Sequence, residues 1–170
     1  MTAEQLFIKY SVEKLNQQAE RISNCLDKLN EDQIWARHSD SENAIGNLVL
    51  HLCGNLRQWI GFGVGGKPDI RVRDREFSAR AGAGTAELKE RLETAVSEAS
   101  EIIRSLTPVR LVEITRVQSY EMSVLEAVYH VVEHFSGHAG QIMYATKQLT
   151  GADLGFYRDL QQPAHSEQVP

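Results

Sequence analysis

The chain has 170 residues, 42% of them hydrophobic and 24% charged, with a formal net charge of −5, which predicts one soluble globular domain. The acidic balance argues against nucleic-acid binding. The sequence shows neither a membrane-spanning apolar run nor a signal-peptide pattern, so we expect a cytoplasmic protein that binds no membrane. The two cysteines, Cys25 and Cys53, lie far apart and outside any CxxC pair, which excludes a disulfide scaffold and a cysteine-rich zinc site.

Apolar residues recur at steps of three and four in four segments, a spacing that predicts amphipathic helices packed at shallow angles. The apolar positions of these segments span Ile8–Leu29, Ile45–Trp59, Leu88–Leu106 and Val124–Leu149. Residues suited to cap the last three helices precede them: Ser41 or Asn43, Thr85, and Ser123. Pro108 follows the third helix and Gly151 closes the fourth. The fold class predicted from this pattern is an all-α four-helix bundle.

Long connections join the second helix to the third, at about residues 63–84, and the third to the fourth, at about residues 108–122. We expect Leu111–Thr115 in the latter to form a short extended piece. The bundle should occupy residues 1–160, and residues 161–170 should form a flexible tail.

The stretch GFGVGGKP (Gly61–Pro68) matches the front of a phosphate-binding loop, GxxxxGK. Pro68 stands where that motif needs a Ser or Thr for magnesium, and the stretch follows a helix instead of a strand. We therefore interpret it as a helix exit followed by a flexible loop.

The fourth helix carries three histidines, His130, His134 and His138, each four residues from the next. At about 100° per residue, His138 falls within the buried stripe and His134 about 40° away at its edge. Side chains at i and i+4 lie about 5–6 Å apart at Cβ, a spacing that suits two imidazoles on one metal ion. His130 lies about 12 Å from His138 along the axis, so we expect it to support the site without binding the ion.

The second helix offers one further candidate ligand, His51, at the border of its apolar stripe. Four polar residues on the same sides of the two helices are expected to orient the imidazoles or a bound water: Asn47, Asn55, Gln58 and Gln141. Cys53 lies about 200° from His51 around the helix, and Glu133 about 140° from His138, so neither is expected as a ligand.

Each histidine taken singly is also compatible with a hydrogen-bonded core residue. Burying two imidazoles without partners is costly, however, and a metal ion is the simplest common partner. Three imidazoles leave at least one coordination position open, because closed structural zinc sites use four protein ligands. Imidazole suits Zn, Ni, Fe and Cu, so the residues alone do not select the metal.

The chain resembles the DinB/YfiT-like superfamily over roughly residues 3–160. The matching stretches are NAIGNLVLHLCGN (Asn43–Asn55), RDREF (Arg73–Phe77), VYHVVEHFSGHAGQI (Val128–Ile142) and DLGFY (Asp153–Tyr157). The resemblance implies an up-up-down-down four-helix bundle, often a homodimer, with one divalent metal ion on three histidines. Here those are His51, His134 and His138, with Zn or Ni as the expected metal.

Members of that superfamily with known activities use low-molecular-weight thiols, and others are classed as metal-dependent hydrolases. The resemblance therefore implies a metal-dependent transferase that activates a thiol, or water, for attack on a small electrophile. Because an activated water usually needs a general base and Glu133 points away, thiol transfer is favoured over hydrolysis. A non-catalytic metal-binding stress-response protein is the alternative. The sequence indicates no catalytic residue beyond the metal site and no thiol-binding motif.

Overall fold

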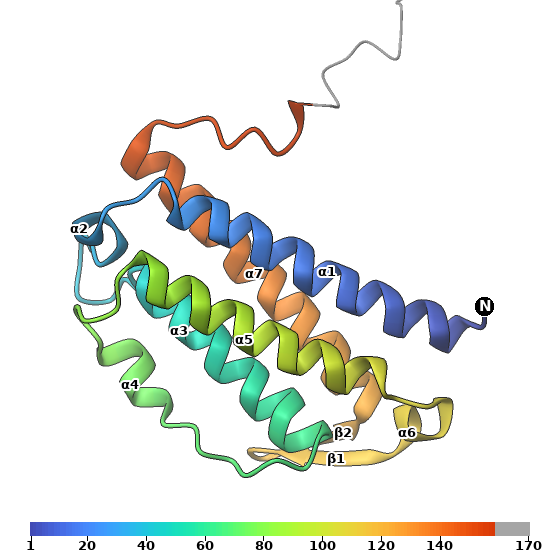
Figure 1. Cartoon of the computed structure of the whole chain (residues 1–170). Helices are drawn as coiled ribbons and strands as arrows, with labels where there is room; N and C mark the ends of the chain where they lie inside the picture. The colour runs from blue at the N-terminus through green and yellow to red at the C-terminus, as the bar shows by residue number, and fades with distance from the viewer. Residues whose placement is uncertain (159–170) are drawn as a thin grey trace, which may run out of the picture.

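The computed structural model describes residues 1–158 and consists mainly of four long helices packed side by side (Figure 1). These helices are α1 (Ala3–Leu26), α3 (Ile45–Leu56), α5 (Thr85–Arg104) and α7 (Val124–Thr150). Shorter helices lie in the connections: α2 (Glu31–Ile34), α4 (Arg73–Ser78) and α6 (Pro108–Val112). The predicted all-α four-helix bundle is confirmed. The expected domain boundary at residue 160 and the flexible tail at 161–170 lie outside the described residues.

The start and the end of α7 follow from local sequence, as predicted. The Ser123 hydroxyl accepts a hydrogen bond from the backbone N–H of Glu126, whose carboxylate accepts one from the N–H of Ser123. This reciprocal pair satisfies backbone donors that have no partner within the helix. At the other end Gly151 adopts a positive φ of 65°, which a glycine reaches without steric cost.

The predicted caps of α3 and α5 are wrong. Ala44 is the N-cap of α3, and its N–H donates to Oδ1 of Asn47 at 3.1 Å, so a side chain inside the first turn replaces the expected Ser41 or Asn43. Gly84 is the N-cap of α5, which makes Thr85 its first residue. Neither N-cap residue, Ala44 nor Gly84, offers a side chain that could accept a capping hydrogen bond.

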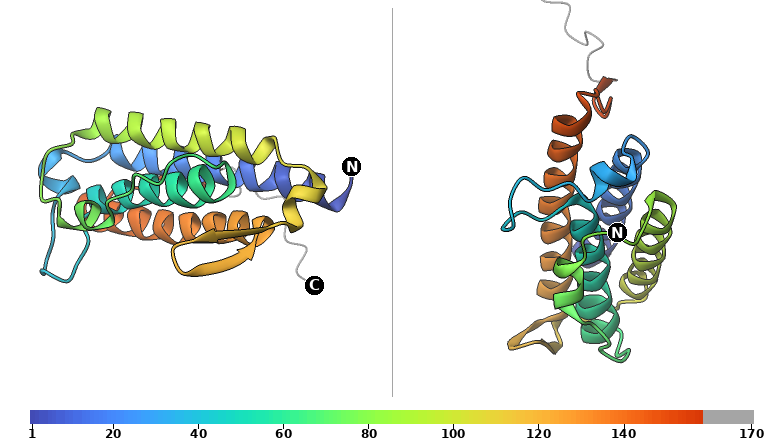
Figure 2. Two further views of the ribbon diagram at one scale, coloured as in Figure 1. Left: turned by 90° about the horizontal axis from the view of Figure 1, so that it is seen from below. Right: turned by 90° about the vertical axis from the view of Figure 1, so that its left-hand side faces the viewer.

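The chain direction of the four long helices is up-down-down-up, so the expected up-up-down-down order is wrong. Asn16 and Asp27 of α1 hydrogen-bond to Ser100 and Lys89 of α5, respectively, which makes these helices antiparallel. The α1–α3 connection stays at one end of the bundle, so α3 must run back along α1 (Figures 1 and 2). The long segment between α3 and α5 then carries the chain back to that end, and α5 runs parallel to α3.

The helix α3 does not end at the first glycine of the GFGVGGKP stretch. It continues as a π-helix, η1 (Arg57–Val64), and the N–H groups of Gly65 and Lys67 close its last wide turns on the carbonyls of Ile60 and Gly61. The loop interpretation therefore holds from Gly65 onward. A π-helix is uncommon and often found near functional sites. Here it carries Trp59, whose ring packs on that of His130, and Gln58, which hydrogen-bonds to Arg71.

A small hairpin precedes α7. The strands β1 (Ile114–Val117) and β2 (Tyr120–Ser123) pair antiparallel, with Ile114 opposite Ser123. The extended piece expected at Leu111–Thr115 is thus only partly correct, because Leu111 and Val112 still belong to α6. The hairpin places Tyr120 near the indole of Trp59, with ring centroids 6.0 Å apart.

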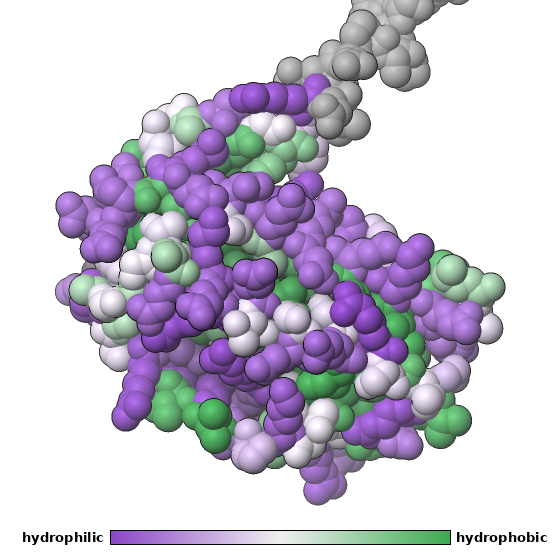
Figure 3. All heavy atoms as spheres, in the orientation of Figure 1, coloured by the Kyte–Doolittle hydropathy of each residue, from purple (hydrophilic) through white to green (hydrophobic). Residues whose placement is uncertain are grey.

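The hydrophobic core fills the space between the four long helices. Each contributes large side chains that are at most 1% exposed, among them Leu15, Leu52, Leu92 and Phe135. The face displayed in Figure 3 is mainly hydrophilic, with smaller hydrophobic areas between the polar ones. None of the helices in residues 1–158 is both long and apolar enough to span a bilayer.

Candidate metal centre

The imidazoles of His51, His134 and His138 meet between α3 and α7. One ring nitrogen of each lies within 4.8 Å of the other two. Nε2 of His51 and Nε2 of His134 are 2.9 Å apart, and the rings of His134 and His138 stand almost perpendicular with centroids 4.5 Å apart. No other group of three His, Cys, Asp or Glu side chains in residues 1–158 converges in this way.

The orientation of His51 is determined by Glu76 of α4. Oε2 of Glu76 lies 3.0 Å from Nδ1 of His51, and both side chains are buried. A carboxylate that accepts the Nδ1–H leaves the lone pair of Nε2 directed at His134. This arrangement, in which a carboxylate binds the far nitrogen of an imidazole, is common in metal centres because it fixes the tautomer and the ring direction.

Glu76 is itself held by Arg71. The guanidinium forms two parallel hydrogen bonds to the carboxylate, Nε to Oε1 and Nη2 to Oε2, each 2.7 Å long. Burial raises the pKa of Glu76, but the hydrogen bonds from Arg71 and His51 outweigh it and leave that pKa below its ordinary value. Nη2 of Arg71 also lies 3.0 Å from Nδ1 of His51. We assign the Nδ1 proton to the contact with Glu76, because the ionised carboxylate is the stronger acceptor.

Gly54 makes room for this ion pair on the surface of α3. A Cβ atom at this position would lie 1.9 Å from Oε1 of Glu76 and 3.0 Å from Nε of Arg71. The first distance is far below van der Waals contact, so any side chain here would displace Glu76. The glycine therefore contributes to the orientation of His51 although it touches none of the three histidines.

The other two imidazoles are also prepared to act as neutral donors. Nδ1 of His138 lies 2.8 Å from Oε1 of Gln141, which accepts its proton and leaves Nε2 free. Burial lowers the pKa of His138, against the opposing effect of that hydrogen bond. Burial, reinforced by His138 and His51, lowers the pKa of His134 to about 4. At neutral pH both rings are uncharged, the form that binds metal ions.

The donor set fits a divalent transition-metal ion. Three imidazoles from two helices converge, and two of them have their second nitrogen engaged by an acceptor. The 2.9 Å contact between the Nε2 atoms of His51 and His134 requires one proton between them, and a metal ion would take the place of that proton. Imidazole donors suit Zn, Ni, Cu and Fe.

A family described as "Protein of unknown function (DUF1572)" matches residues 2–158 of the chain. The protein belongs to this family. No protein with a curated function matches it.

Two solved structures share the fold of this DUF1572 protein. One is a conserved protein from Enterococcus faecalis, with a TM-score of 0.73 and 14% identity over 89% of this chain and 99% of that chain. The other is the DinB-like protein YjoA from Bacillus subtilis, with a TM-score of 0.66 and 14% identity over 87% of this chain and 97% of that chain. At this level of identity the likeness shows the fold alone.

A cavity of about 480 Å³ opens beside His51 and His134. One part of its wall is aromatic, formed by Trp59, Tyr120 and His130. The His130 ring packs on Trp59 with centroids 4.2 Å apart and stacks on His134 at 5.6 Å. His130 therefore lies next to the three converging imidazoles, but its nitrogens are not among the group that could hold one ion.

The four polar residues predicted to support the site differ from one another in where they lie and in what they contact. Asn55 is buried and lines the cavity. Gln58 accepts a hydrogen bond from Nη1 of Arg71 at 2.9 Å. Asn47 lies further away and donates to the backbone carbonyls of Glu76 and Ala79, so it anchors α4. Gln141 contacts His138 directly.

The two side chains not expected as ligands lie outside the cluster. Cys53 is buried in the packing of α3, and burial raises the pKa of its thiol to about 12. Glu133 is exposed to solvent.

Sequence reasoning missed Arg71, Glu76 and Gly54. In the sequence, the RDREF stretch that contains Glu76 indicates only a resemblance to a family. Its role depends on how the segment between α3 and α5 folds back along α3, which helical periodicity does not report. A glycine in the middle of an otherwise helical pattern was the available signal, because such a residue usually has a packing reason.

Proposed function

We propose that this DUF1572 protein binds one divalent metal ion, Zn or Ni, through Nε2 of His51, His134 and His138. We further propose that it is an enzyme in which a small thiol, or water, attacks a small electrophile. The observation that supports this proposal most strongly is the convergence of three imidazoles, two of which, His51 and His134, line a cavity. Glu76 and Gln141 engage the far nitrogens of His51 and His138.

A bound divalent ion with an open position would lower the pKa of a thiol or a water molecule there. The protein's own residues would bind and orient the reactants. The aromatic wall of Trp59, Tyr120 and His130 offers flat faces for a planar electrophile. Asn55 and Gln118 offer amide groups that hydrogen-bond but do not titrate.

The carboxylates near the cavity favour a thiol over water as the nucleophile. Glu126 is the one carboxylate among the cavity's lining residues, and Ser123 holds it in the cap of α7. Those hydrogen bonds lower the pKa of Glu126. Glu76 is engaged by Arg71 and His51. Neither is placed to take a proton from an attacking water, whereas a thiol that loses its proton on binding needs no separate base.

The proposal is tested by assaying Zn- and Ni-loaded protein in two ways. Bacillithiol, mycothiol, glutathione and coenzyme A are each combined with a chloro-arene electrophile, and ester substrates are supplied without thiol. Turnover that needs a thiol, disappears with chelator and is absent from the His51→Ala/His138→Ala double variant supports transfer. Turnover of esters alone supports hydrolysis. Rates equal to those of the double variant on every pairing would leave a non-catalytic metal-binding protein as the better account.

The homodimer also stays a prediction for this protein. Light scattering at micromolar concentration tests it, and a monomer mass throughout the concentration series would reject it.

A further inference from the structure

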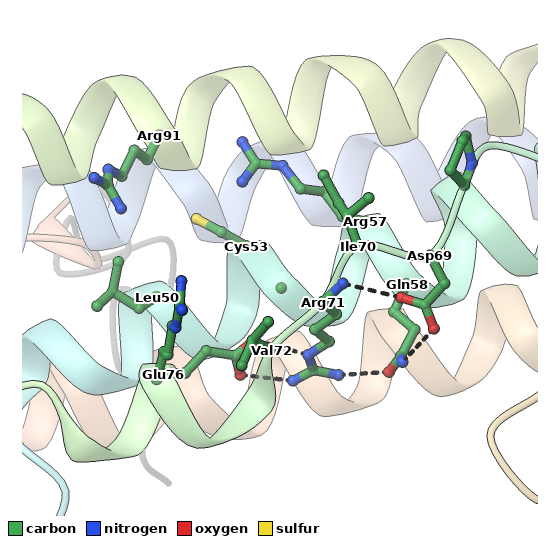
Figure 4. A pocket seen from close by; sticks show the side chains of 13 residues that line it. Leu50, Cys53, Arg57, Gln58, Asp69, Ile70, Arg71, Val72, Glu76 and Arg91 are labelled. Atoms are coloured by element: carbon green, nitrogen blue, oxygen red, sulfur yellow. Dashed lines mark hydrogen bonds and ion pairs between the residues drawn. The ribbon is translucent and has the colours of Figure 1, made fainter.

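A second cavity, of about 270 Å³, lies between α3, residues 68–76 and α5 (Figure 4). Its lining shares one residue with the cavity beside the histidines, Arg71, whose buried side chain forms part of the wall of both. The second cavity contains none of the three converging histidines.

The lining of this cavity carries an excess of positive charge. Four of its residues are arginines and two are acids: Arg57, Arg71, Arg75 and Arg91, with Asp69 and Glu76. Both acids are already engaged, Glu76 by Arg71 and Asp69 by Gln58 and the backbone N–H of Arg71.

Three of the arginines are available to a ligand. Arg57 and Arg75 form no side-chain hydrogen bond or ion pair with any residue in the range 1–158. Arg91 pairs with Glu87 on the surface, where the partner is half exposed and such pairs contribute little to stability. A ligand that bears a negative charge could therefore recruit these guanidinium groups without breaking a buried interaction.

The rest of the lining is apolar. Leu50, Pro68, Ile70 and Val72 contribute to it, and the side chains of Ile70 and Val72 are 81% and 52% exposed. The Cys53 thiol forms part of the same wall and is uncharged, because burial raises its pKa to about 12. Large exposed apolar side chains beside unpaired arginines match a ligand with an apolar body and an anionic group.

From this arrangement we infer that the second cavity binds a small organic anion. Its carboxylate or phosphate lies between Arg57 and Arg91, which flank Cys53 in Figure 4, and its apolar body packs on Leu50, Ile70 and Val72. Guanidinium groups bind both kinds of anion through paired hydrogen bonds. The volume lies just below the usual range for ligand sites, which favours a compact molecule over a nucleotide or a peptide.

The inference is independent of the proposed metal chemistry, so it is tested on metal-free protein. Full-length protein is treated with chelator, dialysed, and titrated with benzoate, phenyl phosphate and the neutral analogue benzamide in a calorimeter. We expect benzoate, phenyl phosphate or both to bind and benzamide to bind at least about tenfold more weakly. Binding of one anion alone identifies carboxylate or phosphate as the preferred group.

Matched variants locate the site. Arg57→Gln and Arg91→Gln should each weaken anion binding about tenfold, and Arg116→Gln, an exposed arginine of β1, should not. In NMR spectra the amide signals of Gly54 and Arg71 should shift on titration, and that of Gly140 should not. Unchanged affinity in the Arg57→Gln/Arg91→Gln double variant would overturn the inference. Equal binding of benzamide, or binding of neither benzoate nor phenyl phosphate, would also overturn it.

Discussion

Oε2 of Glu76 lies 3.0 Å from Nδ1 of His51, and this contact determines which nitrogen of His51 faces the other two histidines. The contact joins a short helix in a long connection to the core helix α3. It couples the geometry of the candidate metal centre to Arg71 and Gly54, which lie outside it.

Replacing Glu76 by Gln should weaken divalent-metal binding about 10- to 100-fold, because the neutral amide fixes the His51 tautomer less firmly and strengthens its donor nitrogen less. The saturated stoichiometry should stay at one ion per chain. Competition with a chromogenic chelator measures the affinity. Glu98→Gln, which removes an exposed carboxylate paired with Lys67, is the matched control and should leave the affinity unchanged. An unchanged affinity in Glu76→Gln would contradict the assigned role of that carboxylate.

Replacing Gly54 by Ala should lower both stability and metal affinity, because the new Cβ would lie 1.9 Å from Oε1 of Glu76. Overpacking of this kind typically costs about 1–3 kcal/mol. Gly140→Ala in α7 is the opposite case: its Cβ would meet no atom within 4 Å, so it should stabilise the protein by about 0.4–1 kcal/mol. Urea unfolding and metal titration of both variants distinguish these outcomes. A Gly54→Ala protein with wild-type stability and affinity would show that Glu76 can move without consequence.

The parts of the site that lie on long helices could be predicted from sequence, because a period of 3.6 residues places side chains around an axis. His134 and His138 fall one turn apart on one stripe, and His51 is the matching histidine on the second long helix. The structure brings these three together. Arg71 and Glu76 could not be placed, because their positions depend on where the segment between α3 and α5 packs.

Two features of the fold escaped prediction for a similar reason. The π-helix at Arg57–Val64 changes the helical period locally, so a fixed angle of about 100° per residue misplaces the side chains that follow it. The order of helix directions depends on the ends at which the connections lie. Apolar periodicity predicts that helices pack but does not indicate their direction.

Lowering the pH should destabilise the metal-free protein between about pH 6.5 and pH 4. Burial and the neighbouring histidines lower the pKa of His134 from its ordinary value of 6.5 to about 4. In that window the unfolded chain carries a proton on this imidazole and the folded protein does not. The free energy of unfolding therefore falls as the pH falls, by at most about 1.4 kcal/mol per pH unit for one group and by less for a partly exposed one.

Urea unfolding of chelator-treated protein at pH 7, 6 and 5 measures this dependence. His134→Gln should flatten it, and His38→Gln, which replaces an exposed side chain, should not. An equally steep loss of stability in His134→Gln and wild type would contradict the assignment to His134.

Replacing His130 by Gln should leave metal stoichiometry near one per chain. Its ring packs against Trp59 and His134 but lies outside the group of nitrogens that converge. A reduced turnover with full metal content would place His130 in the wall that contacts the reactants. Complete loss of the ion would instead show that His130 is itself a ligand.

The most direct measurement of the central claim is the metal content of protein reconstituted with Zn or Ni and freed of excess ion. Elemental analysis should give about one ion per chain for the wild type and for the exposed-histidine control His38→Ala. His51→Ala, His134→Ala and His138→Ala should each lose most of it, because two remaining imidazoles no longer surround the ion. Equal metal content in the wild type and in His138→Ala would contradict the three-histidine site.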